Sequence, residues 1–236
     1  GTVTTTKLTD GTSMIETKLK DGTVVTETRD LNGTTTSKNK FAQIQGLEDI
    51  INIEAGEDFG IAIDSYGIVY VWGNNTNGQL GETSKGNIIL KPTAIQSIGT
   101  KVIDVAAGSK QSVFVAANGT IFGYGNMLNG KLAGMENAIK AQVTNNSIII
   151  LTSNCEVFEY KNGSLTQINI TEKVIDISAT NGSVMYQTVD EKTYVSGENT
   201  YGQLGVGNTQ NVSTPVLANS HSESTFTIGA GYNNTY

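Results

Sequence analysis

The chain has 236 residues, with 15 Lys or Arg against 22 Asp or Glu, so its formal net charge is −7. A surface that neutralises nucleic-acid phosphates needs many cations on one face, and this acidic chain has a single arginine, Arg29. The single cysteine, Cys155, excludes an internal disulfide framework, and the single histidine, His221, excludes a two-histidine metal site. The 27 glycines and the low charged fraction of 16% favour a β-rich protein.

Residues 1–40 are rich in threonine and repeat every 11 residues. The recurring dipeptides are Asp10-Gly11, Asp21-Gly22 and Asn32-Gly33. Such dipeptides are typical of type I′ hairpin turns, in which both central residues have positive φ. The intervening segments, Thr12–Lys20 and Thr23–Leu31, have the length and the Thr and Val content of strands. We therefore predict an antiparallel meander of three or four strands as a first domain, residues 1–40.

This meander has few large apolar residues, so its core is expected to be thin. One interpretation is a solvated spacer or one end of a longer threonine-rich fibre. The other is an exposed strand edge that pairs with another chain.

Residues 41–236, the second predicted domain, contain a longer repeat. Three segments align, namely Ile53–Gly81, Val105–Gly134 and Ile177–Gly205. The repeat signature consists of Gly56 and Gly108; Gly73, Gly125 and Gly197; Gly78, Gly130 and Gly202; and, after the last group, Gln79, Leu80, Leu132, Gln203 and Leu204. Agreement at two independent offsets predicts a repeat architecture.

Two further units are incomplete. Val143–Lys161 fits the first half of a unit, with Thr144 and Lys161 at glycine positions, and no Gly-Gln-Leu-Gly segment follows. Residues 228–236 match only the opening of a unit, with Gly231 at the first glycine position. The reference positions 56, 108, 144, 180 and 231 are thus 52, 36, 36 and 51 residues apart.

Within each unit, apolar and polar residues alternate with period two, and turn residues recur every eight to twelve residues. This pattern predicts an all-β chain. Short antiparallel sheets that repeat along the chain and bury their faces against their neighbours are typical of β-propellers. The expected fold is a partial β-propeller of about four blades plus the start of a fifth, preceded by the β-meander.

Residues 55–81 carry the pattern Ala-Gly-x4-Ile-Ala-Ile-Asp-x2-Gly-x-Val-Tyr-Val-Trp-Gly-x-Asn-x2-Gly-Gln-Leu-Gly, which closely resembles the regulator of chromosome condensation repeat. The recurrences at 107–134 and 179–205 resemble it as well, and the resemblance covers roughly residues 48–236. It implies a propeller with typically about seven blades of about 50 residues. We therefore expect a fragment of a larger propeller, or an open or otherwise completed one. A start at Gly1 rather than Met fits a cut or processed piece.

The eukaryotic founder of that family binds chromatin and activates nucleotide exchange on a small nuclear GTPase. The resemblance carries no residue set for either activity onto this chain. The net charge of −7 argues against a chromatin-binding surface.

We interpret the signature residues as structural, because glycine permits positive φ and close backbone approach. The three leucines are expected to pack between blades, and Gln79 and Gln203 to bond backbone groups of the turn. The glycine-rich segment before Gly81 is not expected to be a phosphate loop, because it lacks the following helix and the Lys-Ser/Thr pair of such loops. We expect no catalytic residue, metal site or cofactor.

One repeat position holds Trp72, Tyr124, Tyr160 and Ser196 in successive units, which indicates packing between blades more than a ligand stack. Cys155 stands at the turn position of Gly67 and Gly119 and is interpreted as an exposed or half-exposed thiol without a histidine partner.

We expect a non-catalytic binding or structural module of a surface or extracellular repeat protein of bacterial type, because Asn, Thr, Lys and Ile are abundant and Arg and Cys scarce. Its partner would be a protein, a glycan or copies of the chain itself joined through exposed β edges. Nucleic acid is not expected, and no apolar run reaches the roughly 20 residues of a membrane span. The alternatives are a cytoplasmic propeller regulator of a small GTPase and a fragment of a glycan-active enzyme with paired carboxylates.

Overall fold

The computed structural model describes residues 1–8, 12–20, 23–41, 44–81, 86–95, 97–218, 230–231 and 234–235. These residues form strands, turns and irregular segments, and none of them lies in a helix that could span a bilayer. The chain divides into two compact units, Gly1–Gly46 and Leu47–Tyr236. The expected all-β fold class is confirmed.

The first unit is an antiparallel meander of the four strands β1 (Thr2–Lys7), β2 (Ser13–Lys18), β3 (Val24–Arg29) and β4 (Thr35–Phe41), paired in chain order. Every side chain of β1 is exposed, and the strand carries Val3 as its one large apolar residue. The buried apolar clusters of the described chain all lie in the second unit. The unit runs past residue 40, because β4 ends at Phe41.

The turn at Asn32-Gly33 is not the expected type I′ turn. Gly33 alone has positive φ, at 79°, and its N–H donates to the carbonyl of Asp30 at 3.0 Å. The Asp30 carboxylate also accepts from the N–H groups of Asn32 and Thr34, at 2.9 and 2.8 Å. The aspartate thus caps a longer turn that needs only one left-handed residue. The dipeptides Asp10-Gly11 and Asp21-Gly22 lie outside the described residues.

The second unit contains four four-stranded antiparallel sheets and the short pair β21–β22. The first sheet holds β5 (Ile50–Ala55), β6 (Phe59–Asp64), β7 (Val69–Asn74) and β8 (Ile88–Ala94); the second holds β9 (Val102–Ala107), β10 (Gln111–Ala116), β11 (Ile121–Gly125) and β12 (Gly130–Lys131); the third holds β13 (Ala138–Val143), β14 (Ile148–Thr152), β15 (Val157–Lys161) and β16 (Ser164–Ile168); the fourth holds β17 (Val174–Ala179), β18 (Ser183–Thr188), β19 (Thr193–Gly197) and β20 (Val212–Leu217); and the pair holds β21 (Ala230–Gly231) and β22 (Asn234–Thr235).

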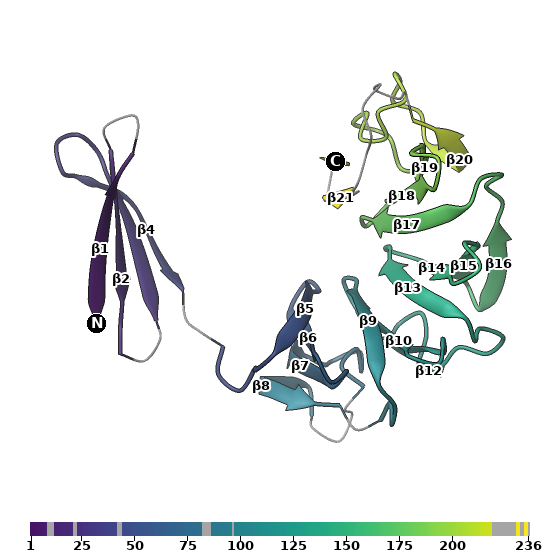
Figure 1. Cartoon of the computed structure of the whole chain (residues 1–236), viewed down its shortest axis with the longest axis horizontal. Coiled ribbons are helices and arrows are strands. Elements are labelled where there is room, and N and C mark those ends of the chain that lie inside the picture. Colours follow the sequence, from purple (N-terminus) through teal and green to yellow (C-terminus); the bar gives the residue numbers. More distant parts are fainter. Residues whose placement is uncertain are drawn as a thin grey trace. The chain divides into compact units, whose positions relative to one another are not determined.

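The four sheets stand side by side in chain order along an arc (Figure 1). Strands pair in sequence order within each sheet, and the first strand of each sheet contacts the first strand of the next. β5, β9, β13 and β17 therefore line the inner side of the arc (Figure 1). This is the arrangement of propeller blades.

Stacking of one sheet on the next buries the same position in each inner strand. Val105, Ala141 and Ile177 occupy this position in the second, third and fourth sheets, and each is at most 1% exposed. Ile53 occupies it in β5, the first strand of the unit, and is 57% exposed. The core is therefore built between sheets, as in other repeat architectures.

A four-residue segment, which we call the leucine turn, recurs at Gly78–Gly81, Gly130–Ala133 and Gly202–Gly205. In the second sheet it overlaps β12, which is why that outer strand has only two residues. The third sheet has no leucine turn and keeps a full outer strand, β16. The second and third sheets thus belong to units of the same short length, 36 residues, for different reasons: the second has a shortened outer strand, and the third lacks the leucine turn.

Gly73, Gly125 and Gly197 mark the point where a third strand gives way to a leucine turn. Their φ angles are 102°, 132° and 108°, and a Cβ on Gly197 would lie 2.1 Å from the carbonyl oxygen of Gly182. In the third sheet β15 enters β16 through the two-residue turn Asn162-Gly163, with φ of 51° and 80°. This is a type I′ geometry without a bulge, so Lys161 can replace glycine there.

Candidate functional site

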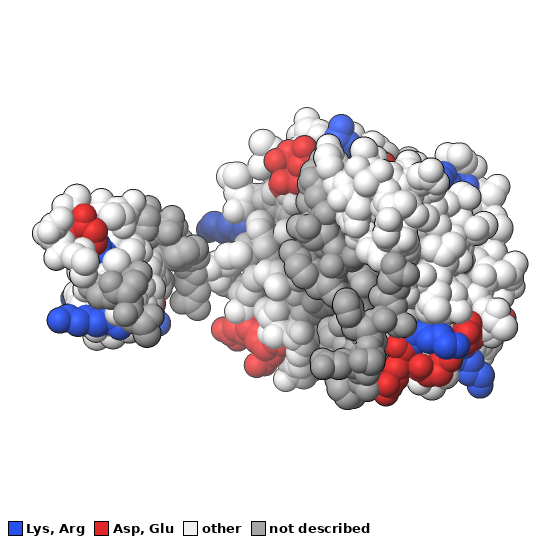
Figure 2. All heavy atoms as spheres, turned by 90° about the horizontal axis from the view of Figure 1, so that it is seen from above, with Lys and Arg blue, Asp and Glu red and all other residues white. Residues whose placement is uncertain are grey.

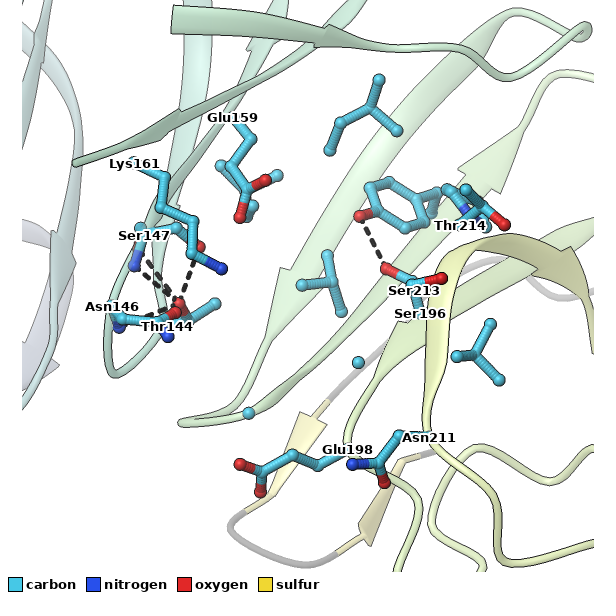
Figure 3. A pocket seen from close by; sticks show the side chains of 18 of the residues that line it. Thr144, Asn146, Ser147, Glu159, Lys161, Ser196, Glu198, Asn211, Ser213 and Thr214 are labelled. Atoms are coloured by element: carbon cyan, nitrogen blue, oxygen red, sulfur yellow. Dashed lines mark hydrogen bonds between the residues drawn. The ribbon is translucent and has the colours of Figure 1, made fainter. Parts of the chain in front are cut away.

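A cavity of about 620 Å³ lies between the third and fourth sheets (Figure 3). Residues of β14, β15 and β16 form one wall, and residues of β18, β19 and β20 form the other. Amide and hydroxyl side chains predominate in the lining, with apolar contributions from Ile149, Val184 and Val212. The site is a half-open recess of mixed polar and apolar surface between two stacked blades.

The leucine turn occupies the corresponding space between the first and second sheets. Leu80 is fully buried there in one cluster with Phe114 and Tyr124 of the second sheet. The Ser112 hydroxyl of β10 donates to the carbonyl of Gln79, which ties the turn to the next sheet. A Cβ on Gly81 would lie 2.8 Å from the Tyr124 ring, so turn and ring are in direct contact.

The next interface repeats this arrangement. Leu132 of the second leucine turn lies in one buried cluster with Ile148 and Ile150 of β14, and Tyr160 packs against that cluster. The third sheet supplies no leucine turn to the fourth. The cavity therefore lies where this segment would pack.

Strand pairing identifies the residues of the fourth sheet that a leucine turn would contact. Ser112 pairs with Tyr124 in the second sheet, and Val184 pairs with Ser196 at the same register in the fourth. By the same register Tyr186 corresponds to Phe114. Val184, Tyr186 and Ser196 all line the cavity, which confirms the structural equivalence of the two places.

The fourth sheet is more polar at this place than the second. Where Phe114 and Tyr124 pack with ring centroids 6.0 Å apart, the hydroxyls of Tyr186 and Ser196 lie 3.0 Å apart in a hydrogen bond. Both residues are buried, at 1% and 8% exposure. Burial raises the pKa of Tyr186 to about 12, and the negative charge of Glu159 acts in the same direction.

The wall from the third sheet carries charge. Glu159 of β15 stands at the position of Val71 in the first sheet and Val195 in the fourth, both of which are buried. Its half-buried side chain points from the strand into the recess, and Lys161 follows on the same strand (Figure 3). Neither residue forms an ion pair with another residue that the structure describes.

Glu198 and Asn211 lie on the opposite wall, toward one end of the recess (Figure 3). The Glu198 side chain lies against Gly182, where a Cβ would come within 2.4 Å of its carboxylate. A smaller recess of about 160 Å³ adjoins the cavity and shares Asn145, Asn181 and Glu198 with it. The charged residues of the cavity lining are thus two carboxylates and one ammonium group.

The repeat signature itself supports this architecture and contributes little to the cavity wall. Gly78, Gly130 and Gly202 all have positive φ, and so do the glycines that end or follow the leucine turns, namely Gly81, Gly134 and Gly205. The side-chain oxygens of Gln79 and Gln203 accept from the N–H groups of Asn77 and Tyr201, each at 2.9 Å. Gly197 is the signature residue that lines the cavity.

Gly56 and Gly108 serve the turn between the first and second strands without positive φ. A Cβ on Gly56 would lie 2.0 Å from the Phe59 ring, so close packing excludes a side chain there. Thr144 and Thr180 stand at this position in the last two sheets, and each hydroxyl accepts from a backbone N–H three residues on. For Gly231 the structure describes the backbone alone, in β21.

Two structural asparagines were not singled out by sequence reasoning. The side-chain oxygen of Asn75 accepts from Leu80 N–H, and that of Asn199 accepts from Leu204 N–H, each at 2.9 Å. Both side chains are at most 4% exposed. In the second sheet, Gln111 holds the equivalent segment by accepting from Met127 and Leu128 N–H groups. The sequence signal for these asparagines was their recurrence two residues after Gly73 and Gly197.

Sequence reasoning also missed Glu159 and Tyr186. The signal lay in departures from the repeat, since Glu159 replaces valine and Ser196 replaces an aromatic residue. Cys155 is partly exposed, with a φ of 63°, and His221 lies outside the described residues. No cluster of metal-ligating side chains occurs among the residues that the structure describes.

A second group of titratable side chains links the inner strands. Asp104 of β9 accepts from Ala141 N–H of β13 at 2.9 Å, and Lys140 pairs with Asp176 of β17. Burial raises the pKa of Asp104 to about 6, although the Ala141 N–H and Lys140 oppose the shift. Burial also raises the pKa of Glu54, and Asp104 adds to that effect. These contacts join successive sheets and involve no residue of the cavity lining.

The stacked four-stranded meanders, each joined to the next through its inner strand, define a β-propeller repeat protein. The family model "Regulator of chromosome condensation (RCC1) repeat" matches residues 66–115 and 190–235, and a second model of the same repeat matches 50–79. The chain thus carries regulator of chromosome condensation repeats within residues 50–115 and 190–235.

Known proteins resemble the chain in sequence, and solved structures resemble it in fold. The "Regulator of chromosome condensation" of Xenopus laevis is 27% identical over 171 residues, which cover 71% of this chain and 35% of the relative. The crystal structure of human WBSCR16 matches with a TM-score of 0.76 at 19% identity, over 95% of this chain and 68% of that one. Prp20p of Saccharomyces cerevisiae matches with a TM-score of 0.67 at 15% identity, over 96% and 66%. The chain thus spans about a third of the Xenopus relative.

Proposed function

We propose that this chain is a non-catalytic, protein-binding propeller module, and that its partner binds in the cavity between the third and fourth sheets. The observation that carries the proposal is the absence of one leucine turn, which leaves an open recess at a place that a peptide segment fills at the two preceding interfaces. A recess shaped by the loss of a chain segment suits another chain segment.

The similarity to Prp20p supports a protein as the binding partner. The solved structure of Prp20p is described together with that protein's binding to Gsp1p and histones. Histones are basic proteins, and this chain has a formal net charge of −7, so its carboxylates suit a basic partner. Lys and Arg side chains, which would repel such a partner, form no continuous patch on the face that Figure 2 shows. Its own nucleic-acid binding is not part of the proposal.

Amine-reactive cross-linking tests this function, because Lys161 provides a reactive group at the rim of the cavity. The chain is incubated with an extract of the source cells, cross-linked and analysed by mass spectrometry. We expect a defined protein cross-linked through Lys161 and not through Lys131, an exposed lysine of the second sheet. Cross-links spread evenly over exposed lysines, or binding to a glycan array without a protein partner, would contradict the proposal.

A role within a surface or extracellular repeat protein remains part of the proposal and rests on composition, with few Cys and Arg and abundant Asn and Thr. Protease treatment of intact source cells tests it, since a surface module is cleaved and an internal one is protected.

The second candidate function is regulation of a small GTPase, favoured by the similarity to the regulator of chromosome condensation. It predicts that the purified chain accelerates nucleotide release from a small GTPase of the source cell. Release at the uncatalysed rate would eliminate it.

A further inference from the structure

Four positions around the cavity differ from their equivalents in the other sheets, and all four changes are toward polarity. Glu159 stands where the other sheets have valine or glycine, and Tyr186 where they have alanine, phenylalanine or isoleucine. Ser196 stands for an aromatic ring and Lys161 for glycine. Loss of the leucine turn alone would leave an exposed apolar surface, because this segment packs on apolar side chains at the other interfaces. The cavity is therefore lined for an occupant that is more polar than leucine.

Glu159 has the most specific environment of these residues. Its position corresponds to Val71, which shares a buried cluster with Leu80 in the first sheet. A carboxylate there faces the place of the missing leucine side chain and is half-buried without an ion pair among the described residues. A cation placed against this carboxylate would be attracted by its unpaired negative charge.

We infer that the cavity receives a turn of the partner protein carrying a lysine or arginine side chain, which replaces the missing leucine turn and places its cationic group against Glu159. This inference rests on the proposed function and names the chemistry of the partner. Tyr186 and Ser196 flank the site with their bonded hydroxyls, and the lining asparagines and threonines supply partners for the backbone of the incoming turn. Glu198 adds a second carboxylate on the opposite wall.

The ammonium group of Lys161 repels a cation of the partner, so removing it should have the opposite effect to removing the Glu159 charge. It lies two residues beyond Glu159 on the same strand and is exposed at the rim of the recess. Two carboxylates and one ammonium group leave the lining net negative. Removal of the Lys161 charge should therefore strengthen binding of a cationic turn, whereas removal of the Glu159 charge should weaken it.

Peptides derived from the chain's own leucine turn provide the probe. The peptide of residues 74–81, blocked at both ends, is made with leucine, lysine or glutamate at the place of Leu80. Binding to the full chain is followed by the shifts of backbone amide signals in NMR titrations. We expect the lysine peptide to shift the amides of Tyr186 and Ser196, and to bind at least fivefold more tightly than the glutamate peptide.

Glu159→Gln should weaken the lysine peptide at least fivefold, whereas Lys161→Gln should strengthen it. Glu136→Gln is the matched control, because Glu136 is exposed and outside the cavity lining, and should leave the affinity unchanged. Amide spectra of each variant report whether it is folded.

Equal binding of the leucine and lysine peptides, unaffected by Glu159→Gln, would overturn the inference of a cationic occupant. Failure of every peptide to shift cavity amides would overturn the occupation by a turn. In both cases the proposed function stands if a protein partner still cross-links through Lys161. Absence of any such partner, with or without peptide binding, is the separate failure of the proposed function.

Discussion

The hydroxyl of Tyr186 lies 3.0 Å from that of Ser196, at the place where Phe114 and Tyr124 pack ring against ring two interfaces earlier. The smaller serine and the absent leucine turn together open the recess between the third and fourth sheets. A repeat fold thereby acquires one interface that differs from the others. Position in the repeat, rather than any catalytic motif, distinguishes the site.

Strain at a hairpin turn predicts a stabilising substitution. Cys155 has a φ of 63° at the position where Gly67 and Gly119 have 81° and 79°. A non-glycine residue in this region costs about 1–2 kcal/mol, partly offset by the greater flexibility of glycine in the unfolded chain. Cys155→Gly should raise the free energy of unfolding by about 0.5–1 kcal/mol in denaturant titrations.

Cys155→Ala is the control, because it removes the thiol and keeps the strained φ, so it should give no such gain. The reverse change, Gly119→Ala, should destabilise by more than about 2 kcal/mol, since its Cβ would lie 2.2 Å from the carbonyl oxygen of Glu136. A larger gain for Cys155→Ala than for Cys155→Gly would show that strain is not the cause.

Stacking between sheets predicts unequal costs at one repeat position. Ile177 is fully buried between the third and fourth sheets, whereas Ile53 is 57% exposed. Ile177→Ala should lower the free energy of unfolding by about 2–5 kcal/mol, and Ile53→Ala by less than about 1 kcal/mol. Urea titrations of the two variants of this chain measure the difference, and equal losses would refute burial by stacking.

The buried carboxyl of Asp104 predicts a pH-dependent stability. Because burial raises its pKa from 3.8 to about 6, the folded chain binds more protons than the unfolded chain between these values. Its contribution to stability therefore declines as pH rises through this window. Asp104→Asn removes the charge and keeps an acceptor for Ala141 N–H.

The stability of Asp104→Asn relative to the wild type should thus increase from pH 4 to pH 7, by about 2 kcal/mol. Comparing variant with wild type at each pH removes the titration of other carboxyls, although Glu54, Lys140 and Asp176 remain as charged neighbours. A difference that is constant across this range would mean that Asp104 has an ordinary pKa.

The buried asparagine of the leucine turn predicts local opening. Asn199 is fully buried, accepts from Leu204 N–H and donates to the carbonyl of Asn208. Asn199→Ala leaves both groups unpaired and should cost about 2 kcal/mol and speed proteolysis within residues 200–211. Asn126→Ala, at an exposed asparagine, is the control and should leave proteolysis unchanged. Protection of residues 200–211 in both variants would contradict this role.

Much of the fold was predictable because each unit repeats the same turn chemistry and strand alternation. The glycines at the end of the third strand illustrate this. Gly73, Gly125 and Gly197 occur in the three sheets that have a leucine turn, and Lys161 stands at this position in the sheet that has none. The Asn32-Gly33 turn was misjudged, because the Asp30 side chain competes for the backbone N–H groups and allows a longer turn.

The cavity was not predictable from the motifs, because it results from something missing. A short third unit was visible in the sequence, but which space it empties depends on the contact between Leu80 and the neighbouring sheet. Strand register then shows that Glu159, Tyr186 and Ser196 surround that space. The sequence showed Ser196 as a departure from an aromatic repeat position, but it did not single out Glu159 or Tyr186.

Filling the recess tests the central claim most directly. Ser196→Tyr restores the aromatic residue found at Trp72, Tyr124 and Tyr160, and its ring would pack beside Tyr186 as Tyr124 does beside Phe114. The affinity of the partner identified through Lys161 is measured by titration calorimetry for wild type and folded variant. We predict at least a tenfold loss in Ser196→Tyr; an unchanged affinity would contradict binding in this cavity.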